Sequence, residues 1–448
     1  MNYVIIGGDA AGMSAAMQMM KYDPEAEITI LEKGEIYSYA QCGMPYVIGG
    51  VVDSVDDLIA RDVDVFREKY GMDARTLHEV ERVDTKERTV SGRIVGTGET
   101  FQVPYDKLLI ASGASPFVPI WKGMDVAGIH TLKTIPDTTE IAEDVKKDVQ
   151  DITIVGGGYI GLEMAENFRK LGKKVRMLIR SGQVAKIFDE SMAAYIMEEA
   201  ERHGIDVLLH EEIKEVIGKE SVTAIRTNKT IHETDMVLVA TGIQPNTAFL
   251  QGSGVDVARN GAVQVNEWME TNVRNVYAAG DCAQQYHLVK EAYDYVPLGT
   301  HANKQGRIAG MNMAGQYRVY RGMTGTSIMQ FVDLTLGKTG LSDREAANQE
   351  LPYASVEIAG KHMARYYPGS EKISVKLTFR TDNGLLLGGQ LVGKAGIDKR
   401  TDVLATALFN KMTVEQLEDL DLSYAPPYNG VWDPIQRAAR KAVGKVMN

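Results

Sequence analysis

The residue with the clearest chemical potential is Cys42, in a nearly uncharged segment that runs from Tyr37 to Tyr46. The chain has only one other cysteine, Cys282, which lies far away in the sequence. A mechanism that uses two neighbouring cysteines is therefore excluded, and single-cysteine redox chemistry remains. The ordinary alternative is a buried apolar cysteine, since free cysteines are among the most buried residues. We expect Cys282 to be such a structural residue.

An active cysteine needs a lowered pKa, because the thiolate and not the thiol is the nucleophile. Directly after Cys42, the run Gly43-Met44-Pro45 can begin a helix, and a helix N-terminus carries partial positive charge. We therefore predict that a helix beginning here lowers the pKa of the Cys42 thiol.

A glycine-rich loop near the N-terminus indicates the first element that must position the cysteine. The apolar run 3–7 is typical of a buried parallel strand, and it leads through Gly7-Gly8-Asp9-Ala10-Ala11-Gly12 into a helix. A second strand, 28–31, ends in Glu32. In the dinucleotide-binding βαβ unit the glycines let the backbone reach a pyrophosphate, and the acid binds a ribose hydroxyl. The usual middle glycine of this pattern is Asp9 here.

A second complete unit begins at the strand 152–155 and continues through Gly156-Gly157-Gly158-Tyr159-Ile160-Gly161 into a helix over 162–171. Its partner strand, 175–179, ends without an acid, and Arg180 follows. An arginine in this place suits the 2′-phosphate of NADPH, although NADH also remains possible. Two such units predict two dinucleotide sites.

Further strands are predicted at 108–113, 237–242 and 276–281, each ending in a small-residue turn. The stretch 53–105 is charged and irregular and then alternates in short strand-like pieces. After about residue 325 the pattern changes to alternating strands and two late helices near 401–410 and 434–446.

Composition restricts the classes of partner. The net charge of −11 argues against nucleic acid or an anionic membrane surface. The uncharged run 36–52 is broken by glycine and proline and is too short to span a bilayer. Two cysteines do not make a disulfide scaffold and are typical of the reducing cytoplasm, where we expect this protein.

These motifs together resemble the flavoprotein pyridine nucleotide–disulfide oxidoreductases over essentially the whole length. The segment 39–42, with Tyr366-Tyr367-Pro368-Gly369 and Tyr424-Ala425-Pro426-Pro427-Tyr428, is similar to the coenzyme A disulfide reductases. Their single-cysteine branch also contains NADH oxidases, NADH peroxidases and persulfide reductases. The peroxidases carry a histidine in the first glycine loop, where this chain has Asp9-Ala10-Ala11, which counts against peroxidase activity.

The resemblance implies an α/β fold with two Rossmann-like domains and an α+β dimerisation domain. The implied FAD-binding domain comprises 1–115 and 245–322, the NAD(P)H-binding domain 116–244, and the dimerisation domain 323–448. The implied cofactors are FAD and NADPH or NADH, with coenzyme A as substrate or mixed disulfide. The implied assembly is a homodimer.

The resemblance also assigns residues to roles. Tyr159 would gate the flavin and Glu163 would contact the nicotinamide side. The full set of implied cofactor contacts is Gly7, Gly8, Ala11, Gly12, Glu32, Lys33, Val80, Ala111, Ser112, Gly113, Gly156, Gly158, Tyr159, Ile160, Gly161, Glu163, Arg180, Gly242, Gly280, Asp281 and Ala302. The resemblance places coenzyme A contacts on one polar helix face, Ser14, Gln18 and Lys21, and at Ser38 and Gln41. The basic residues Arg61, Arg67 and Lys69 are candidates to hold the phosphates of coenzyme A. His301 is a candidate for a place near the flavin or the substrate thiol, with a purely structural role as the alternative. Both the helix face and the basic residues have a plain alternative as solvated surface.

The predicted reaction is NAD(P)H-dependent reduction of coenzyme A disulfide through a mixed disulfide on Cys42. NADH oxidation, reduction of a coenzyme A persulfide or polysulfide, and a redox sensor without turnover are the alternatives. The departing thiolate needs a proton donor, and no histidine lies near Cys42 in the sequence. The resemblance supplies Tyr366, or its neighbour Tyr367, and Tyr424 from the second subunit. Simple aromatic packing at an interface is the alternative role of these tyrosines.

Overall fold

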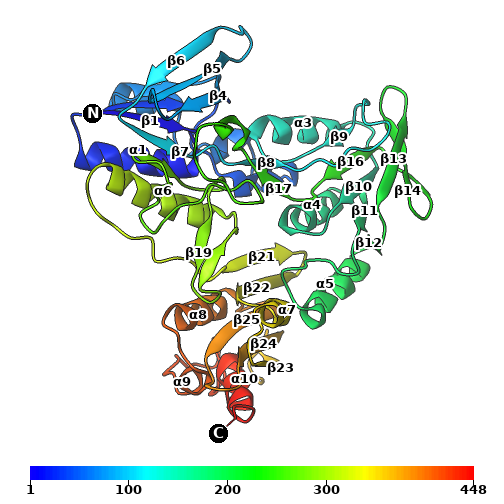
Figure 1. Ribbon diagram of the computed structural model, residues 1–448. Helices are drawn as coiled ribbons and strands as arrows, with labels where there is room; N and C mark the ends of the chain where they lie inside the picture. The colour runs from blue at the N-terminus through cyan, green and yellow to red at the C-terminus, as the bar shows by residue number, and fades with distance from the viewer. Residues whose placement is uncertain (448) are drawn as a thin grey trace.

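The computed structural model describes residues 1–447 as two Rossmann-like α/β units and a C-terminal α+β unit (Figure 1). The first unit is built on a five-stranded parallel sheet in the order β18-β7-β1-β2-β3. Its strands are β1 (Asn2–Ile6), β2 (Glu27–Leu31), β3 (Asp73–Arg75), β7 (Lys107–Ile110) and β18 (Val276–Ala278). The inner strand β7 is buried on both faces, which explains its continuous apolar run.

Two helices, α1 (Ala10–Tyr22) and α6 (Gly299–Met313), lie side by side in this unit (Figure 1). Their close approach depends on glycines of α6. A β-carbon on Gly306 would lie 2.1 Å from the Ala11 carbonyl oxygen, and one on Gly310 would lie 2.3 Å from that of Ala15. The segment with β18 and α6 thereby joins the N-terminal unit across a long sequence separation.

The second unit repeats the first on a parallel sheet in the order β12-β11-β10-β16-β9. Its strands are β9 (Ile129–His130), β10 (Asp151–Val155), β11 (Lys174–Ile179), β12 (Ile205–Leu209) and β16 (Met236–Val239). Its helices are α3 (Ile135–Lys146), α4 (Tyr159–Lys170) and α5 (Glu190–Arg202). The helix predicted from residue 162 begins three residues earlier, at the end of the glycine loop.

Short antiparallel pieces surround the two parallel sheets. One three-stranded sheet contains β4 (His78–Asp84), β5 (Thr89–Ile94) and β6 (Thr100–Pro104), and another contains β13 (Ile213–Gly218), β14 (Val222–Thr227) and β15 (Ile231–Glu233). The chain passes between the units along β8 (Ala114–Pro116) and returns along β17 (Ile243–Pro245), which pair with each other. The charged stretch after residue 53 was predicted as irregular, but it forms two short helical turns, Val55–Leu58 and Val65–Lys69, before β3.

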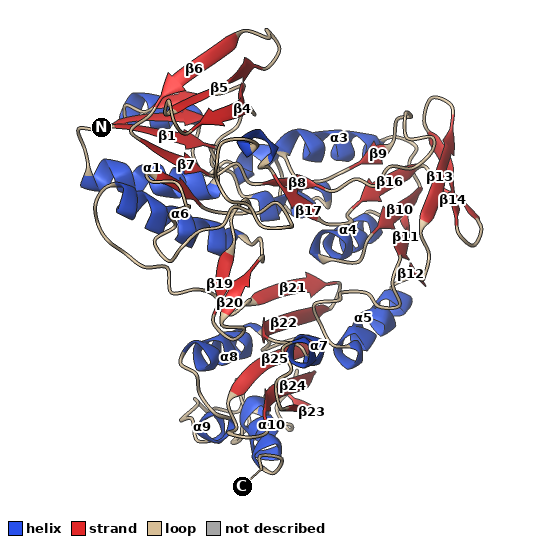
Figure 2. Ribbon diagram, in the orientation of Figure 1, coloured by secondary structure: helices blue, strands red, loops and turns tan. Residues whose placement is uncertain are grey.

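The C-terminal unit is a five-stranded antiparallel sheet with helices packed on it (Figure 2). Its strands are β21 (Ser327–Phe331), β22 (Leu334–Gly340), β23 (Tyr353–Lys361), β24 (Lys372–Arg380) and β25 (Leu386–Gly393). Its helices are α7 (Asp343–Asn348), α8 (Asp398–Phe409), α9 (Val414–Glu418) and α10 (Pro434–Val443). A hairpin of β19 (Gln285–His287) and β20 (Ala292–Asp294) precedes α6.

Two buried carboxylates attach the C-terminal sheet to the second α/β unit. Glu166 of α4 accepts a hydrogen bond from the Val332 amide at 2.9 Å, and Glu199 of α5 accepts one from the Asp333 amide at 3.1 Å. Both acceptors are almost fully buried, and both donors belong to the turn between β21 and β22. This turn therefore links the helix after the second glycine loop to the C-terminal sheet. No helix within residues 1–447 has both the length and the apolar character needed to cross a membrane.

Candidate active site

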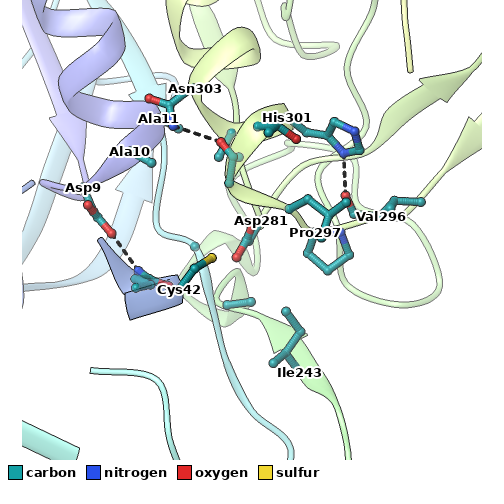
Figure 3. Close-up of a pocket in the computed structure, with 18 of the residues that line it drawn as sticks. Asp9, Ala10, Ala11, Cys42, Ile243, Asp281, Val296, Pro297, His301 and Asn303 are labelled. Atoms are coloured by element: carbon teal, nitrogen blue, oxygen red, sulfur yellow. Dashed lines mark hydrogen bonds between the residues drawn. The ribbon is translucent and has the colours of Figure 1, made fainter. Parts of the chain in front are cut away.

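A cavity of about 2600 Å³ lies where the three units meet, and Cys42 is part of its wall (Figure 3). It brings together most of the residues predicted for cofactor contact: Gly7, Ala11, Glu32, Lys33, Val80, Ala111, Ser112, Gly113, Gly158, Tyr159, Ile160, Glu163, Gly242, Gly280, Asp281 and Ala302. Gln41 and His301 of the predicted substrate contacts also line it. The cavity lies at the carboxyl ends of the strands of both parallel sheets, which is where open α/β folds bind ligands.

The two glycine loops are built alike. A β-carbon on Gly7 would lie 2.2 Å from the Ala111 carbonyl oxygen, and one on Gly156 would lie 2.2 Å from that of Ala240. Both glycines have φ above 100°, a conformation that side-chain-bearing residues rarely adopt. The predicted glycines Gly8, Gly12, Gly156 and Gly161 do not line the cavity within the described chain. They allow other atoms of the chain to pack closely against the two loops.

Glu32 is held at the end of β2 by the first loop. Its carboxylate accepts hydrogen bonds from the Gly8 and Gly34 amides, each at 2.7 Å. Next to it, the exposed Lys33 pairs with Glu79 at 2.8 Å. A dinucleotide fits this arrangement, because a fixed carboxylate and the helix N-terminus after Gly7 face the same cavity.

The second unit has a cation in the corresponding place. The Gly7 amide donates to the Leu31 carbonyl oxygen and the Gly156 amide donates to that of Leu178, so Arg180 takes the place of Lys33. Arg180 is exposed and lies outside the cavity wall. Its guanidinium group is therefore accessible to the outer end of a bound nucleotide.

The predicted lowering of the Cys42 pKa is wrong for this chain. Cys42 is exposed on the open cavity, but the surrounding protein atoms still partly desolvate the thiol; this desolvation raises its pKa first, and the Glu163 carboxylate raises it next. Helix α2 (Met44–Ile48) does begin beside the cysteine, but it has only five residues, and Cys42 lies in the 3-10 turn Gln41–Gly43 before it. Such a short helix offers little positive potential against the desolvation of the thiol and the surrounding carboxylates.

One cation opposes this effect, and sequence reasoning missed it. Lys133, just before α3, pairs with Asp281 at 3.1 Å and lowers the pKa of Cys42. The two partners are 148 positions apart, so no local pattern pointed to the pair. Glu163, which was predicted, has its own pKa raised to about 7 by burial and by Glu166.

His301 lies at the start of α6 with its ring buried, and its Nδ1 is 2.9 Å from the Val296 carbonyl oxygen (Figure 3). Burial lowers the pKa of His301, which favours the neutral ring. Tyr159 of the second loop is also in the cavity wall, and burial raises its pKa to about 12.

The remaining predicted substrate contacts lie elsewhere. Ser14, Gln18 and Lys21 share the less buried side of α1, where the Ser14 hydroxyl donates to Asn303 at 2.8 Å. Ser38 belongs to the segment before Cys42 but does not reach the cavity wall. Arg61 and Lys69 are exposed, and the Lys69 ammonium lies 5.5 Å from the centre of the Tyr70 ring. In the described part of the chain, the cavity wall includes none of these six residues.

The predicted tyrosines lie together on the surface of the C-terminal unit. The Ala364 amide donates to the Pro426 carbonyl oxygen, which joins the two proline-containing turns, and Tyr424 raises the pKa of Tyr366 through a hydrogen bond. Tyr366 is 75% exposed and Tyr424 is 49% exposed. Neither these two nor Tyr367 lines the cavity of the same chain within residues 1–447.

Family models match most of the chain. Residues 1–296 match pyridine nucleotide-disulphide oxidoreductase, and residues 326–434 match the dimerisation domain of the same family. The chain is 38% identical over 439 residues to an NAD(P)H sulfur oxidoreductase (CoA-dependent) of Pyrococcus abyssi, covering 98% of this chain and 97% of that protein. It is 33% identical over 441 residues to a coenzyme A disulfide reductase of Staphylococcus aureus, covering 98% and 99%.

The solved structures agree with this. The structure of reduced CoADR-RHD from Bacillus anthracis has a TM-score of 0.96 at 34% identity and covers 99% of this chain and 80% of that one. The predicted fold class and the predicted use of FAD and NAD(P)H are thereby confirmed. This chain, with two dinucleotide units, a cysteine between them and a dimerisation domain, belongs to the pyridine nucleotide-disulphide oxidoreductases and is an NAD(P)H-dependent flavoprotein enzyme.

Proposed function

We propose that the enzyme reduces coenzyme A disulfide with NAD(P)H through a single redox-active cysteine, Cys42. The observation that carries this proposal is that Cys42 is the cysteine in a cavity lined by both dinucleotide units, whereas Cys282 is fully buried. We assign FAD to residues 1–115 and 245–322, NAD(P)H to 116–244, and dimerisation to 323–448. The crossing at β8 and β17 supports the two boundaries between the first domains.

In the proposed reaction the Cys42 thiolate attacks one sulfur of coenzyme A disulfide. A new S–S bond forms between Cys42 and one coenzyme A, and the other coenzyme A leaves as a thiolate that takes up a proton. FAD, when bound, supplies the two-electron relay from nicotinamide to sulfur. Two electrons then cleave the mixed disulfide, so the second coenzyme A leaves and the Cys42 thiolate is restored.

Side chains of the protein are proposed to stabilise the thiolate and to transfer protons during this cycle. Lys133 favours the thiolate of Cys42 over the thiol, and Asp281 keeps Lys133 in place. Glu163, with a pKa near 7, is able to exchange a proton at the pH of the reaction. Tyr366 and Tyr424 of a second copy are the proposed proton donors to the departing thiolate, because hydroxyls can donate and these are exposed on the dimerisation domain.

The experiment combines a variant with a mass measurement. Cys42→Ser should bind FAD and accept electrons from NAD(P)H, but its rate of coenzyme A disulfide reduction should fall by at least about 100-fold. Intact mass of the native enzyme should show an adduct of coenzyme A mass that reduction removes. Disulfide reduction near the wild-type rate in Cys42→Ser would overturn the proposal.

A second candidate uses the same cysteine. A persulfide or polysulfide on coenzyme A, or oxygen, would be reduced in the same cavity, and Cys42 would then carry an extra sulfur or an oxygen. An added oxygen in the intact mass, with oxygen consumption that exceeds disulfide turnover, would favour the oxidase.

A further inference from the structure

Asp9 replaces the middle glycine of the first dinucleotide loop and stands at the N-cap position of α1. An aspartate there ordinarily accepts hydrogen bonds from the amides of the first helical turn. Within residues 1–447 its side chain makes no such capping bond. The amides at the start of α1 therefore remain available to an anionic ligand, and the carboxylate is used elsewhere.

The Asp9 carboxylate holds the segment that carries the cysteine (Figure 3). Gln41 donates from Nε2 to Oδ2 at 2.7 Å, and the Tyr39 amide donates to Oδ1 at 3.2 Å. The neighbouring Gly8 carbonyl oxygen accepts from the Ser38 amide at 3.0 Å. Two consecutive residues of the dinucleotide loop thus bind three groups directly before Cys42.

This segment needs external support because its backbone is strained. Ser38 has φ of 48°, in the left-handed region that residues with a β-carbon rarely occupy. Cys42 follows in a single 3-10 turn, which is a weak structure by itself. Two further backbone hydrogen bonds support the segment: the Ala40 amide donates to the Leu58 carbonyl oxygen, and the Ala60 amide donates to the Ser38 carbonyl oxygen.

A carboxylate in this place is costly for the fold. The pKa of Asp9 is raised to about 6, chiefly by burial and also by the nearby Glu32, although the hydrogen bonds from Gln41 and Tyr39 and the charge of Lys133 act to lower it. A glycine would avoid this cost, but it would leave Gln41 and the Tyr39 amide without these acceptors.

We propose that Asp9 is a positioning residue for the redox cysteine: its carboxylate fastens Tyr39 and Gln41 to the dinucleotide loop and so fixes where Cys42 stands relative to the bound cofactor. The inference rests on the proposed redox role of Cys42. It also gives Gln41 a role within the protein, in place of the contact with coenzyme A that the sequence predicted.

The test compares Asp9→Ala, Asp9→Asn and Gln41→Leu in the FAD-loaded enzyme, with Asp57→Ala as a control. Asp57 is an exposed aspartate near the same segment, and in the described chain its carboxylate accepts no hydrogen bond. Asp9→Ala should lower kcat for coenzyme A disulfide by at least about tenfold, because a small misplacement of a reacting group is costly. Its KM for NAD(P)H and its rate of FAD reduction should stay within about twofold of wild type. Asp9→Asn should restore most of the loss, since its amide can accept from Tyr39 and pair with a flipped Gln41.

A second measurement does not depend on turnover. Alkylation of reduced enzyme by iodoacetamide, mapped by mass spectrometry, should be several-fold faster at Cys42 in Asp9→Ala and also in Gln41→Leu, while the buried Cys282 stays unmodified as an internal reference. Gln41→Leu keeps the Asp9 carboxylate, whose charge itself raises the pKa of Cys42, so a faster reaction in this variant reports the loss of positioning. The double variant Asp9→Ala, Gln41→Leu should lose no more activity than Asp9→Ala, because the hydrogen bond that Gln41→Leu removes is one of the two that Asp9→Ala already removes.

Three results would overturn the inference: turnover and alkylation of Asp9→Ala at wild-type levels, an Asp9→Asn as impaired as Asp9→Ala, or multiplied losses in the double variant. If Asp9→Ala fails to bind FAD, the same criteria apply to Gln41→Leu, which leaves the dinucleotide loop intact. Failure of the proposed function is distinguishable, because then Cys42→Ser itself would still reduce coenzyme A disulfide.

Discussion

Cys42 shares its surroundings with the carboxylates of Glu163, Asp281 and Asp9, and with the ammonium of Lys133. Three negative groups and one positive group favour the protonated thiol, and burial acts in the same direction. Among the charges, Glu163 has the largest effect on the cysteine. The reactivity of the thiol should therefore depend on the ionisation of Glu163.

We predict that Glu163→Gln makes Cys42 react several-fold faster with iodoacetamide above pH 7, but not below pH 6. Glu163 has a pKa of about 7, so below this pH it is mostly neutral and its removal changes little. Above this pH it is ionised and opposes formation of the thiolate, and glutamine removes that opposition. The measurement is the pH profile of alkylation in reduced protein, with the exposed Glu143→Gln as control. A uniform change across the whole pH range would contradict this explanation.

At the scale of elements, the end of β11 distinguishes the second dinucleotide unit from the first. There Ile179 and Arg180 take the places of Glu32 and Lys33. An acid in the first of these places would repel a 2′-phosphate, and the arginine beside it can bind one with paired hydrogen bonds.

Arg180→Ala is therefore expected to raise the KM for NADPH by about tenfold and to leave that for NADH within about twofold, because only NADPH carries the extra phosphate. Ile179→Glu should shift the preference toward NADH. Steady-state kinetics with both nucleotides decide the matter, and equal losses for both would show that Arg180 has only a structural role.

The elements that were predictable from the sequence are those with local signals. Strands β1, β7, β10 and β16 are short continuous apolar runs next to glycine turns, and both signals lie within about ten residues. Helix α6 gave no such signal, because its packing face is defined by glycines that fit the backbone of α1. Its amphipathic pattern is accordingly weak, and only the tertiary contact explains it.

The same distinction applies to the site. The glycine loops, Glu32, Cys42 and Glu163 could be placed from motifs and from the resemblance to a known family. Lys133 and the role of Asp9 could not, because each depends on a partner from a distant or separately folded segment. The direction of the Cys42 pKa was wrong for the same reason: the helix after it was visible, whereas the carboxylates around it were not.

The two tyrosine turns depend on a buried ionic cluster in the C-terminal unit. Arg400, 1% exposed, pairs with Asp433 at 3.0 Å and donates to the His362 carbonyl oxygen and to Asn429. His362 precedes the turn with Tyr366, and Asn429 follows the turn with Tyr424. One side chain thus connects both turns.

Arg400→Met should lower the free energy of unfolding by about 3–5 kcal/mol, because it leaves Asp433 buried without its charged partner. Lys411→Met is a matched control, since it breaks an ion pair with Glu291 in which both side chains are mostly exposed. Such a pair contributes at most about 1 kcal/mol. Urea unfolding measures both variants, and equal effects would contradict a special contribution from the buried cluster.

At the scale of the whole molecule, exposed aromatic side chains are found around the two tyrosine turns of the C-terminal unit. Tyr366, Tyr428, Val431 and Trp432 are between 48% and 75% exposed, and all lie in or next to the two tyrosine turns. Apolar and aromatic groups gathered on one face mark an interaction surface. Because the chain carries the dimerisation domain of its family, a second copy is the natural occupant.

A dimer would also bring further hydroxyl donors to the cavity. In the proposed reaction the departing coenzyme A thiolate takes up a proton, and within the described chain Tyr366 and Tyr424 are not part of the cavity wall. Burial lowers the pKa of His301, and its Nδ1 is engaged with a backbone carbonyl oxygen. We therefore expect Tyr366 and Tyr424 of one copy to complete the cavity of the other.

A Tyr366→Phe, Tyr424→Phe variant should remain dimeric and keep reduction of FAD by NAD(P)H, but it should lose most of its disulfide-reducing activity. Mixed with Cys42→Ser after subunit exchange, it should regain activity. In a mixed dimer one cavity combines a serine with two phenylalanines, and the other combines an intact Cys42 with both tyrosines. Random exchange makes half of the dimers mixed, with one of two sites intact, so the mixture should approach about one quarter of wild-type activity. Native mass spectrometry verifies the exchange. If mixed dimers form without any recovery, the tyrosines do not act across the interface.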